Sequence, residues 1–423
     1  MNFLQKIFIA YAILEILSIL IYLPRMILWF KGFKPQKRLV AKEKRKFGLI
    51  IPARNESETI PCLLESIKTL DYPKELFTTH IIVKDPADPT LQLAPTYIDQ
   101  NLFLYTVPTQ KRKADSLDAC FKSILEDKDK QCDAYIIVDA DCMLTPNFLT
   151  EMNNAMESGA DVIIGRKRIK NWESNNKKNR NVIANCSAMT YPGVDAMGNK
   201  AKAEMGHALN LCGQGMLLTH KFILHAGGYP YKSITEDYEI GANCILDGFK
   251  AHYYEYAEIY SEEPTSHKVY NDRRTRWLKG YMDCSRKYGK ALREYTFKQG
   301  KLKKDALFFI YGVYPLFCMF GASAVAIITF VTSSITLAIM GSSALALEAL
   351  YYALIVAGIA YFELFFYTCL NLSVDRDINK MTLGEKLKLI FIMPFFLLEY
   401  AGIFFKAAFT KEDDWVPIKR IKM

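Results

Sequence analysis

The stretch Tyr135-Ile136-Ile137-Val138-Asp139-Ala140-Asp141 decides the fold and marks a first candidate site. Four apolar residues run directly into two acids, and Thr145-Pro146 predicts the start of a helix shortly afterwards. A buried strand, a polar turn and a helix form the repeating unit of a parallel sheet. Ligands of such sheets bind at the carboxyl ends of the strands, so we expect both carboxylates at a binding edge.

The same alternation of short apolar runs and amphipathic stretches continues through the middle of the chain. The predicted strands are Phe47–Ile51, Thr79–Val83, Leu102–Val107, Tyr135–Val138, Asp161–Ile164 and Ala251–Ile259. The predicted helices are Glu58–Leu70, Ala114–Leu125, Pro146–Glu157 and Asp237–Leu246. The pattern predicts an α/β domain. The polar stretch Asn171–Asn181 is interpreted as a surface loop.

Apolar segments flank this domain on both sides. The chain has 423 residues, 51% of them apolar, and a net charge of +9. Its mean hydropathy of +0.02 averages the apolar flanking segments with a central domain of ordinary soluble composition. Phe3–Phe30 exceeds the roughly 20 residues that a membrane span needs and has no small-residue cleavage site behind it. We therefore predict a retained anchor over residues 1–31. Three further apolar runs predict a transmembrane region over residues 305–409, and they are Ala306–Val331, Ala344–Leu372 and Leu387–Phe409.

Basic clusters predict which side of the membrane the domain faces. Glu43 is the only acid in a cluster of basic residues that follows the first span and consists of Lys31, Lys34, Lys37, Arg38, Lys42, Lys44, Arg45 and Lys46. Such clusters mark the cytoplasmic flank of a span, and lipid headgroups explain this one better than nucleic acid does. We expect an integral protein of the plasma (inner) membrane, with a cytosolic catalytic domain over residues 47–300.

The C-terminal segment leaves two topologies open. If residues 387–409 cross the membrane, the tail over residues 410–423 lies outside. If they are re-entrant or interfacial, the tail returns to the cytosol. The lysines of this basic tail favour the second topology. The tail carries Trp415 and could cover the site as a gating segment or simply bind anionic lipid. Within the spans, Glu348 is expected at an interface, whereas Glu363 lines a path or pairs two helices.

Three motifs could carry chemistry. Asp139 and Asp141 offer hard oxygen ligands for Mg²⁺ or Mn²⁺ shared with a diphosphate, although solvated turn residues would look the same. Glu236 and Asp237 open a helix, where they form either an ordinary acidic first turn or a general base. A third motif combines guanidinium groups with an indole in Arg273-Arg274-Thr275-Arg276-Trp277, which suits a leaving diphosphate or, alternatively, a membrane-surface helix. The ten cysteines form no CxxC pair and are expected to be reduced thiols.

These motifs, in this order, resemble the family 2 membrane glycosyltransferases, which include cellulose, chitin and hyaluronan synthases and shorter bacterial relatives. The resemblance covers about Phe47 to Gly280 and rests on Pro52–Glu56, Asp85, Asp139–Asp141, Thr235–Asp237 and Arg276-Trp277, together with Leu211–Gly215. It implies a nucleotide-sugar-binding domain of the GT-A type, with a mixed, mostly parallel sheet flanked by transmembrane helices.

The resemblance also implies roles for individual residues. Asn55, Glu56 and Asp85 would hold the uridine, with Lys113 near the nucleotide. Asp139 and Asp141 would bind the nucleotide with its metal, and Asp237, beside Glu236, would deprotonate the acceptor. Arg276, with Arg273 in the same guanidinium cluster, would steady the diphosphate. The acceptor would lie against Cys212, Gly213, Gln214 and Trp277.

Two positions depart from the family pattern. Arg273 stands four residues before the tryptophan, where the family usually has Gln, and Asp85-Pro86-Ala87-Asp88 replaces the usual Asp-Gly-Ser type. Both departures put the detailed contacts of the substrate in doubt, but neither removes a charged group that the chemistry needs.

The leading hypothesis is an inverting, metal-dependent transferase that moves sugar from a UDP-sugar to a growing β-linked polysaccharide, with coupled secretion. The alternative adds one sugar to a membrane lipid. Glycan or lipid is therefore the expected acceptor, and the oligomeric state stays open. A transporter would need more polar residues within its spans, and a catalytically dead glycan-binding module would have lost Asp139, Asp141 or Asp237.

Overall fold

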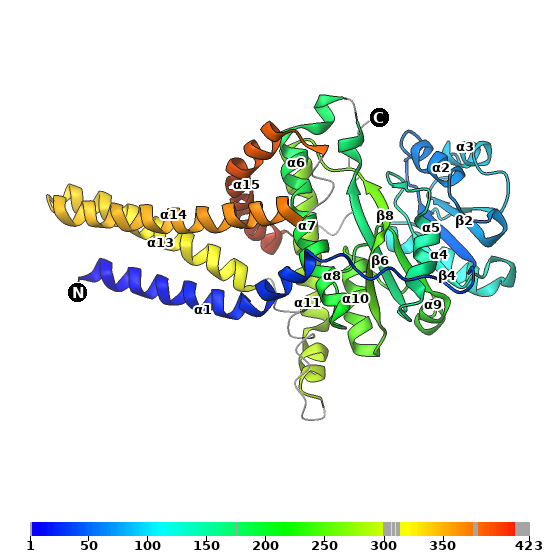
Figure 1. Ribbon diagram of the computed structural model, residues 1–423, viewed down its shortest axis with the longest axis horizontal. Coiled ribbons are helices and arrows are strands. Elements are labelled where there is room, and N and C mark those ends of the chain that lie inside the picture. The colour runs from blue at the N-terminus through cyan, green and yellow to red at the C-terminus, as the bar shows by residue number, and fades with distance from the viewer. Residues whose placement is uncertain are drawn as a thin grey trace.

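The computed structural model describes residues 2–174, 176–298, 306, 309, 314–374 and 380–410 of the chain. A sheet domain lies at one end of the molecule, and long apolar helices extend from its other side (Figure 1). The predicted gating segment around Trp415 lies outside the described residues.

The parallel half of the sheet contains four strands that the sequence predicts. They are β1 (Phe47–Pro52), β2 (Phe77–Val83), β3 (Leu102–Thr106) and β4 (Ala134–Ile137), in the spatial order β3-β2-β1-β4. Leu49 stands opposite Thr79 on one side and Ile136 on the other. Strands β1, β2 and β4 are buried along almost their whole length because helices cover both faces of the sheet. Their carboxyl ends therefore meet at one edge.

The second half of the sheet is mixed. It contains β5 (Met143–Leu144), β6 (Val162–Ile169), β7 (Met216–Thr219) and β8 (Ala251–Ser261). Strand β7 is antiparallel to both β4 and β6, whereas β6 and β8 are parallel. The sequence predicts β6 and β8 but not β5 or β7, because runs of two and four residues carry too little periodic signal. In the described residues the sheet has eight strands, and four of its seven pairings are parallel.

Helices pack on both faces of the sheet. The core on one face joins side chains of α2 (Ile60–Lys68) and α5 (Phe148–Met156) to the sheet, and the core on the other joins α4 (Lys113–Glu126), α9 (His220–Ala226) and α10 (Glu236–Asp247). Alternate residues of one strand enter opposite cores, as Leu49 and Ile50 do. The prediction that α5 begins at Pro146 is wrong by two residues. Thr145 instead donates its hydroxyl to the carbonyl oxygen of Glu258 at 3.1 Å.

The polar stretch 171–181 is only in part the surface loop that its composition suggests. Glu173 and residues 176–178 are exposed. Asn171, however, is 1% exposed, and its amide donates to the carbonyl oxygens of Asn179 and Glu263 at 2.8 and 3.0 Å. Trp172 donates its indole N–H to Asn185 at 3.0 Å. The prediction is wrong at these two positions because their side chains are buried and hydrogen-bonded within the protein.

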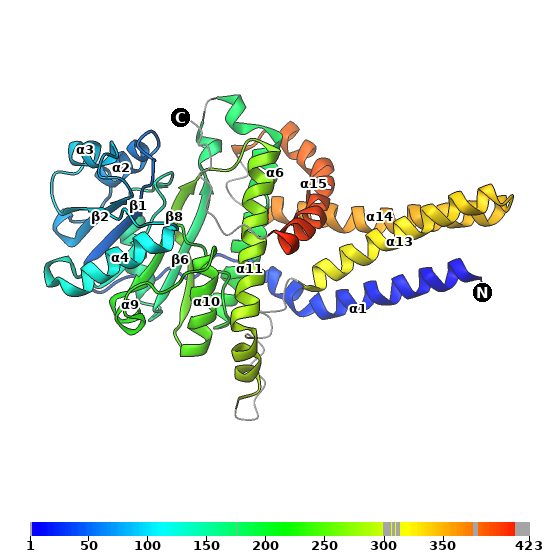
Figure 2. The ribbon, with the colours of Figure 1, turned by 180° about the vertical axis from the view of Figure 1, so that it is seen from behind.

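Short helices connect the sheet domain to the apolar helices. They are α6 (Val182–Ala188), α7 (Thr190–Val194) and α8 (Lys200–Glu204), with a π-helical turn over Asp195–Asn199. The 30-residue helix α11 (His267–Thr296) lies between α10 and the apolar helices (Figure 2). A short helix, α3 (Thr90–Leu93), follows β2. The cysteines that the structure describes are free thiols.

Four helices of the described chain are long and apolar enough to cross a membrane. They are α1 (Phe3–Gly32), α13 (Tyr314–Ile339), α14 (Ser343–Val374) and α15 (Leu383–Phe409). The first three share one apolar core, whereas α15 runs at a steep angle to α14 and packs largely on α6 and α11 (Figure 1). Whether residues 387–409 cross the bilayer stays a prediction. Glu348 accepts hydrogen bonds from Asn2 and Gln5.

Candidate active site

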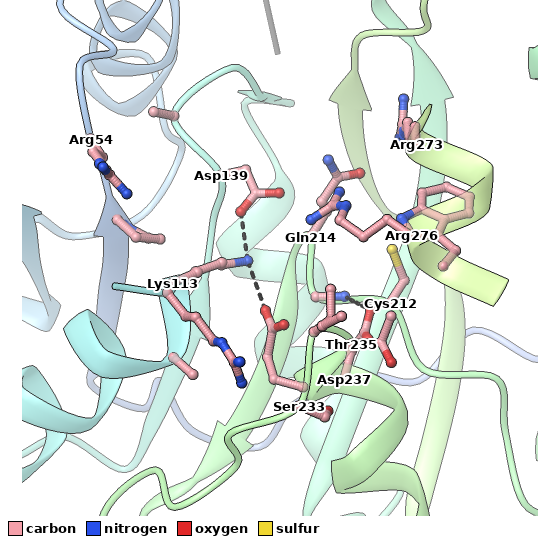
Figure 3. Close-up of a pocket in the computed structure, with 18 of the residues that line it drawn as sticks. Arg54, Lys113, Asp139, Cys212, Gln214, Ser233, Thr235, Asp237, Arg273 and Arg276 are labelled. Carbon is pink, nitrogen blue, oxygen red and sulfur yellow. Dashed lines mark hydrogen bonds and ion pairs between the residues drawn. The ribbon is translucent and has the colours of Figure 1, made fainter. Parts of the chain in front are cut away.

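A cleft with a cavity volume of about 170 Å³ opens at the carboxyl ends of β1 and β4. We call its two sides the strand-end wall and the helix wall. The strand-end wall includes Arg54, Glu56, Gln110, Lys113 and Asp139, and the helix wall includes Asp237, Arg273, Arg276 and Trp277. Figure 3 shows Arg54 and Asp139 on one side of the cleft and Arg273 and Arg276 on the other.

Lys113 joins the two walls. It is the first residue of α4, and its ammonium nitrogen lies 2.7 Å from Asp139 Oδ1 and 3.4 Å from Glu236 Oε1 (Figure 3). Burial opposes the positive charge, but the carboxylates of Asp139 and Glu236 outweigh it and raise the pKa of Lys113 above its ordinary value. The lysine is therefore held as a cation at the centre of the cleft.

Asp237 occupies the first turn of α10, beside the glycine of the Cys212-Gly213-Gln214 segment. Its Oδ2 accepts the backbone N–H of Gly213 at 2.9 Å, and its Oδ1 accepts that of Tyr238 at 2.8 Å. Burial raises the pKa of Asp237 to about 6, with a further contribution from Glu236 and an opposing one from Lys113. A carboxylate with such a pKa is ionised at neutral pH and still basic enough to accept a proton.

Helix α11 packs so closely on this turn that only glycine fits at position 280. A methyl group built on Gly280 would collide with the side chain of Thr235. The rings of Tyr238 and Tyr281 lie 5.1 Å apart and extend the same contact. The position of Asp237 is therefore tied directly to α11, which carries the rest of the helix wall.

A buried charge network supports the helix wall from behind. Glu263 is fully buried and lies 2.7 Å from the Lys167 ammonium nitrogen and 3.4 Å from Arg273 Nη1, and it also accepts a hydrogen bond from the Ser187 hydroxyl. Burial raises the pKa of Glu263, but Arg273 and Lys167 overcome this effect and lower it to about 2. The carboxylate is therefore permanently ionised, and the surrounding cations outnumber it.

Trp277 lies against two guanidinium groups. The guanidinium carbons of Arg273 and Arg274 are 4.7 and 4.5 Å from its ring, close enough for cation–π attraction. Arg273 also donates to the carbonyl oxygen of Glu262 at 3.2 Å, and Arg274 donates to Thr190 at 3.0 Å. Both arginines are therefore fixed by protein groups, and they fix the indole.

Arg276 differs from its two neighbours. Within the part of the chain that the structure describes, its guanidinium has no hydrogen-bond or ion-pair partner, although it lines the cleft. Burial lowers its pKa, and the carboxylates of the cleft partly counteract that effect. This cation is consequently available to an anionic ligand.

The structure brings most of the predicted site residues into the cleft. They are Glu56, Lys113, Asp139, Cys212, Gly213, Gln214, Glu236, Asp237, Arg273, Arg276 and Trp277. Asn55, Asp85 and Asp141 are not among the lining residues. The Asn55 backbone N–H donates to Asp88 at 3.1 Å, and Asp85 caps its own turn through the N–H of Ala87 at 2.9 Å.

The fit to a divalent metal rests on Asp139. Its carboxylate is a hard oxygen ligand that faces the cleft, as Mg²⁺ or Mn²⁺ requires. Asp141 is 1% exposed and does not line the cleft. The described residues contain no group of three or more His, Cys, Asp or Glu placed to hold a metal by themselves. The arrangement fits an ion that a bound diphosphate would help to coordinate.

Sequence reasoning missed Lys167, Glu263 and Gln110. Glu262 and Glu263 follow directly after β8, so acids at a strand end were an available signal for Glu263. Lys167 lies within β6 and Gln110 in the turn after β3, where neither has a motif around it. Only the folded chain shows that Gln110 lines the cleft and that Lys167 pairs with Glu263 behind the helix wall.

Comparison with known proteins agrees with this geometry. The model of "Glycosyl transferase family group 2" matches residues 135–367, and that of "Glycosyl transferase family 2" matches residues 49–218. The probable glycosyltransferase YdaM of Bacillus subtilis is 24% identical over 255 residues, which are 58% of this chain and 57% of the relative. A probable glycosyltransferase of Sulfolobus acidocaldarius is 22% identical over 245 residues, 56% of this chain and 50% of the relative.

A probable glucomannan 4-beta-mannosyltransferase 7 of Oryza sativa is 22% identical over 242 residues, 56% of this chain and 40% of the relative. This chain thus spans about half the length of the curated relatives it matches. One similar solved structure is that of the mannosyltransferase PcManGT of Pyrobaculum calidifontis in complex with GDP-Man and Mn²⁺. It superposes on this chain with a TM-score of 0.57 and 18% sequence identity, and the superposition covers 83% of this chain and 99% of that one. The likeness confirms the GT-A type fold. Since one family model covers more than half of its residues, the chain belongs to glycosyl transferase family group 2.

Proposed function

We propose that this protein is a membrane-embedded inverting glycosyltransferase that moves a sugar from a nucleotide-sugar donor to an acceptor hydroxyl. One observation carries the proposal. A carboxylate whose pKa burial raises to about 6, Asp237, faces the same cleft as the cations Lys113 and Arg276. The cleft thus combines a general base with groups that stabilise a leaving diphosphate.

The chemistry needs one displacement at the anomeric carbon. Asp237 takes the proton of the acceptor hydroxyl, and the oxygen forms a bond to the anomeric carbon. The bond from that carbon to the diphosphate breaks, and its electron pair leaves with the nucleoside diphosphate. A single displacement inverts the configuration, so an α-linked donor gives a β-linked product. Hydrogen bonds from Gly213 and Tyr238 hold the base in place.

The two cations and Asp139 serve the leaving group. Arg276 has no partner among the described residues and offers its guanidinium fork to the phosphate oxygens. Lys113 exchanges part of its contact with Asp139 and Glu236 for the diphosphate. When bound, Mg²⁺ or Mn²⁺ would neutralise part of the diphosphate charge, with Asp139 as the protein ligand in the cleft. Trp277 presents the indole that would stack on the acceptor sugar.

The proposed donor is a UDP-sugar, and the proposed acceptor is a growing β-linked polysaccharide that leaves through the apolar helices. The alternative acceptor is a membrane lipid that receives one sugar. One structural observation favours the alternative: α15 packs on α11, so the helix wall lies next to the apolar helices. The basic flank after α1 supports a cytosolic catalytic domain at the plasma (inner) membrane.

The experiment that tests the function measures nucleoside diphosphate release by the full-length protein in detergent. The donors are a panel of UDP-sugars and GDP-mannose, each with Mn²⁺ or Mg²⁺, and radiolabelled product is sized. A high-mass product that a specific glycanase degrades supports the polymerase. A single product that organic solvent extracts supports the lipid acceptor. No release from any donor would contradict the proposal.

A further inference from the structure

Gln110 is a buried amide in the cleft that no part of the proposed chemistry uses. Its side chain is 4% exposed and lines the cleft. Its carbonyl oxygen Oε1 is buried and accepts no hydrogen bond from any residue that the structure describes. Buried polar atoms in folded proteins are nearly always hydrogen-bonded, so an orphaned acceptor that lines a cleft points to a missing donor.

The backbone holds Gln110 firmly at this place. Its N–H donates to the carbonyl oxygen of Val107 at 3.0 Å, and the N–H of Val107 donates to that of Val83 at 2.9 Å. The second bond continues the pairing of β3 with β2 beyond the last residue of the strand. Gln110 is therefore fixed at the carboxyl end of β3, three residues before Lys113 opens α4.

The sheet order separates Gln110 from the groups proposed to hold the diphosphate. Asp139 follows β4, whereas Gln110 follows β3, and β1 and β2 lie between these two strands. A donor whose diphosphate lies at Lys113 and Asp139, with its sugar toward Asp237, must extend its nucleoside along the strand-end wall. Arg54, Glu56 and Gln110 all line that wall.

The chemistry of the amide selects one part of the nucleoside. A carbonyl oxygen needs a hydrogen-bond donor, and ionised phosphate oxygens have none to give. Ribose hydroxyls do have donors, but the carboxylate of Glu56 on the same wall accepts them more strongly than a neutral amide does. What remains is the edge of the base. Uracil and guanine carry a protonated ring nitrogen, an N–H beside a carbonyl oxygen, whereas neutral cytosine and adenine carry an unprotonated ring nitrogen beside an amino group at that position.

We propose that Gln110 accepts a hydrogen bond from the ring N–H of the donor's base and so selects a nucleoside diphosphate sugar with uracil or guanine. The proposal rests on the proposed function, because it assumes a nucleotide-sugar in this cleft. Cytosine and adenine place the lone pair of that nitrogen against Oε1, so they can pair only if the amide turns or the base shifts to offer its amino group. Sites built around a hydrogen bond discriminate against such ligands.

Direct nucleotide binding tests the proposal without a sugar or an acceptor. The full-length protein in detergent, with Mn²⁺, is titrated with UDP, GDP, CDP and ADP. We expect UDP or GDP to bind at least about tenfold more tightly than CDP and ADP. Gln110→Leu, which is nearly isosteric and cannot accept a hydrogen bond, should remove most of that preference.

Two further variants make the result specific. Gln110→Glu keeps an acceptor oxygen, so it should weaken all four nucleotides through repulsion and retain their order. Gln131→Leu is the matched control, because Gln131 precedes β4 at the opposite end of the strand and donates to Leu125 at 3.2 Å. It should bind all four nucleotides as the unmodified protein does.

The other outcomes separate the two proposals. If Gln110→Leu binds all four nucleotides with the same order as the unmodified protein, the residue does not read the base. If it weakens all four equally, it contacts the ribose, and base selection is again contradicted. If the unmodified protein binds no nucleoside diphosphate, the proposed function fails, and base selection fails with it.

Discussion

The two walls of the cleft differ in how completely the protein builds them. On the helix wall, Arg273 and Arg274 are held by protein groups and lie against Trp277. On the strand-end wall, Oε1 of Gln110 has no hydrogen-bond partner among the described residues, and Lys113 bridges to Asp139 and Glu236 across the middle of the cleft. Apart from Arg276, the helix wall is preorganised, whereas the strand-end wall presents groups that a ligand would complete.

This difference indicates which partner each wall suits. A nucleotide-sugar brings its own charge and hydrogen-bonding groups, so it can complete an open wall. A neutral sugar acceptor brings little binding energy, so a rigid surface reduces the entropic cost of placing it. The following changes test this comparison, beginning with the largest expected effect.

Asp237→Asn removes the proposed base without removing a cation. We expect the rate of transfer to fall by about 10³-fold, because general bases contribute roughly 10²–10⁴-fold. Nucleoside diphosphate binding should change little, since asparagine keeps the shape of the side chain and the proposed donor contacts at Lys113, Asp139 and Arg276 stay in place. Steady-state turnover and nucleotide titration on the same preparation check both parts. A variant that retains its turnover would exclude Asp237 as the base.

Glu263→Gln leaves the cations behind the helix wall without their carboxylate. Breaking a buried ion pair from one side costs about 3–5 kcal/mol, so the free energy of unfolding should fall by that order. Thermal unfolding in detergent measures it, with Glu65→Gln as the control, because 61% of the Glu65 side chain is exposed on the outer face of α2. Because the pKa of Glu263 is lowered, its carboxylate contributes to the free energy of unfolding above pH 4.5. This contribution is lost as the pH falls toward about 2 and the carboxylate is protonated. An unchanged melting temperature would contradict the network.

Arg276→Ala removes the cation that has no partner in the described structure. Deleting one group that stabilises developing negative charge costs about 10²-fold in turnover, and we expect a loss of that size with folding intact. Arg286→Ala is the matched control, because Arg286 lies on the same helix with 71% of its side chain exposed. Equal turnover in the two variants would mean that Arg276 does not act on the diphosphate.

The pH profile sharpens the comparison because Lys113 of one wall acts on Asp237 of the other. Asp237 is protonated below its pKa of about 6, so the rate should fall by about tenfold for each pH unit below that value. Lys113 lowers the pKa of Asp237, so Lys113→Gln should move the descending limb to higher pH. Rates measured between pH 4.5 and 8.5 decide this. A limb that does not move would show that the two groups are not coupled.

Prediction from the sequence was most accurate where the residues of one short segment formed a recognisable pattern by themselves. The strands β1 to β4 appeared within two residues of their positions because buried parallel strands are continuous apolar runs. Asp139 and Asp237 could be named because a strand end and a helix start mark them, whereas Lys113 was named only through the resemblance to the family. Strands β5 and β7 were missed because they are short and owe their pairing to distant neighbours.

The features that the sequence did not predict depend on contacts between residues that are far apart in the chain. Glu263 meets Lys167 across 96 positions, and no local pattern marks that pair. The orphaned oxygen of Gln110 becomes visible only when the turn after β3 is folded. The polar stretch after β6 was misread for the same reason, since Asn171 is buried by partners that the sequence does not place beside it.

Helix α11 has a consequence for how far an acceptor must reach. Its 30 residues form a rod roughly 45 Å long. Gly280 contacts the turn at Thr235, and the next two residues, Tyr281 and Met282, share an apolar cluster with Ala407 of α15. The turn beside the proposed base therefore lies within about one helix diameter, roughly 10–12 Å, of an apolar helix. A hydroxyl attached to a lipid would need only a short spacer to bridge that gap, so lipids carrying headgroups of graded length would act as a ruler for the depth of the cleft.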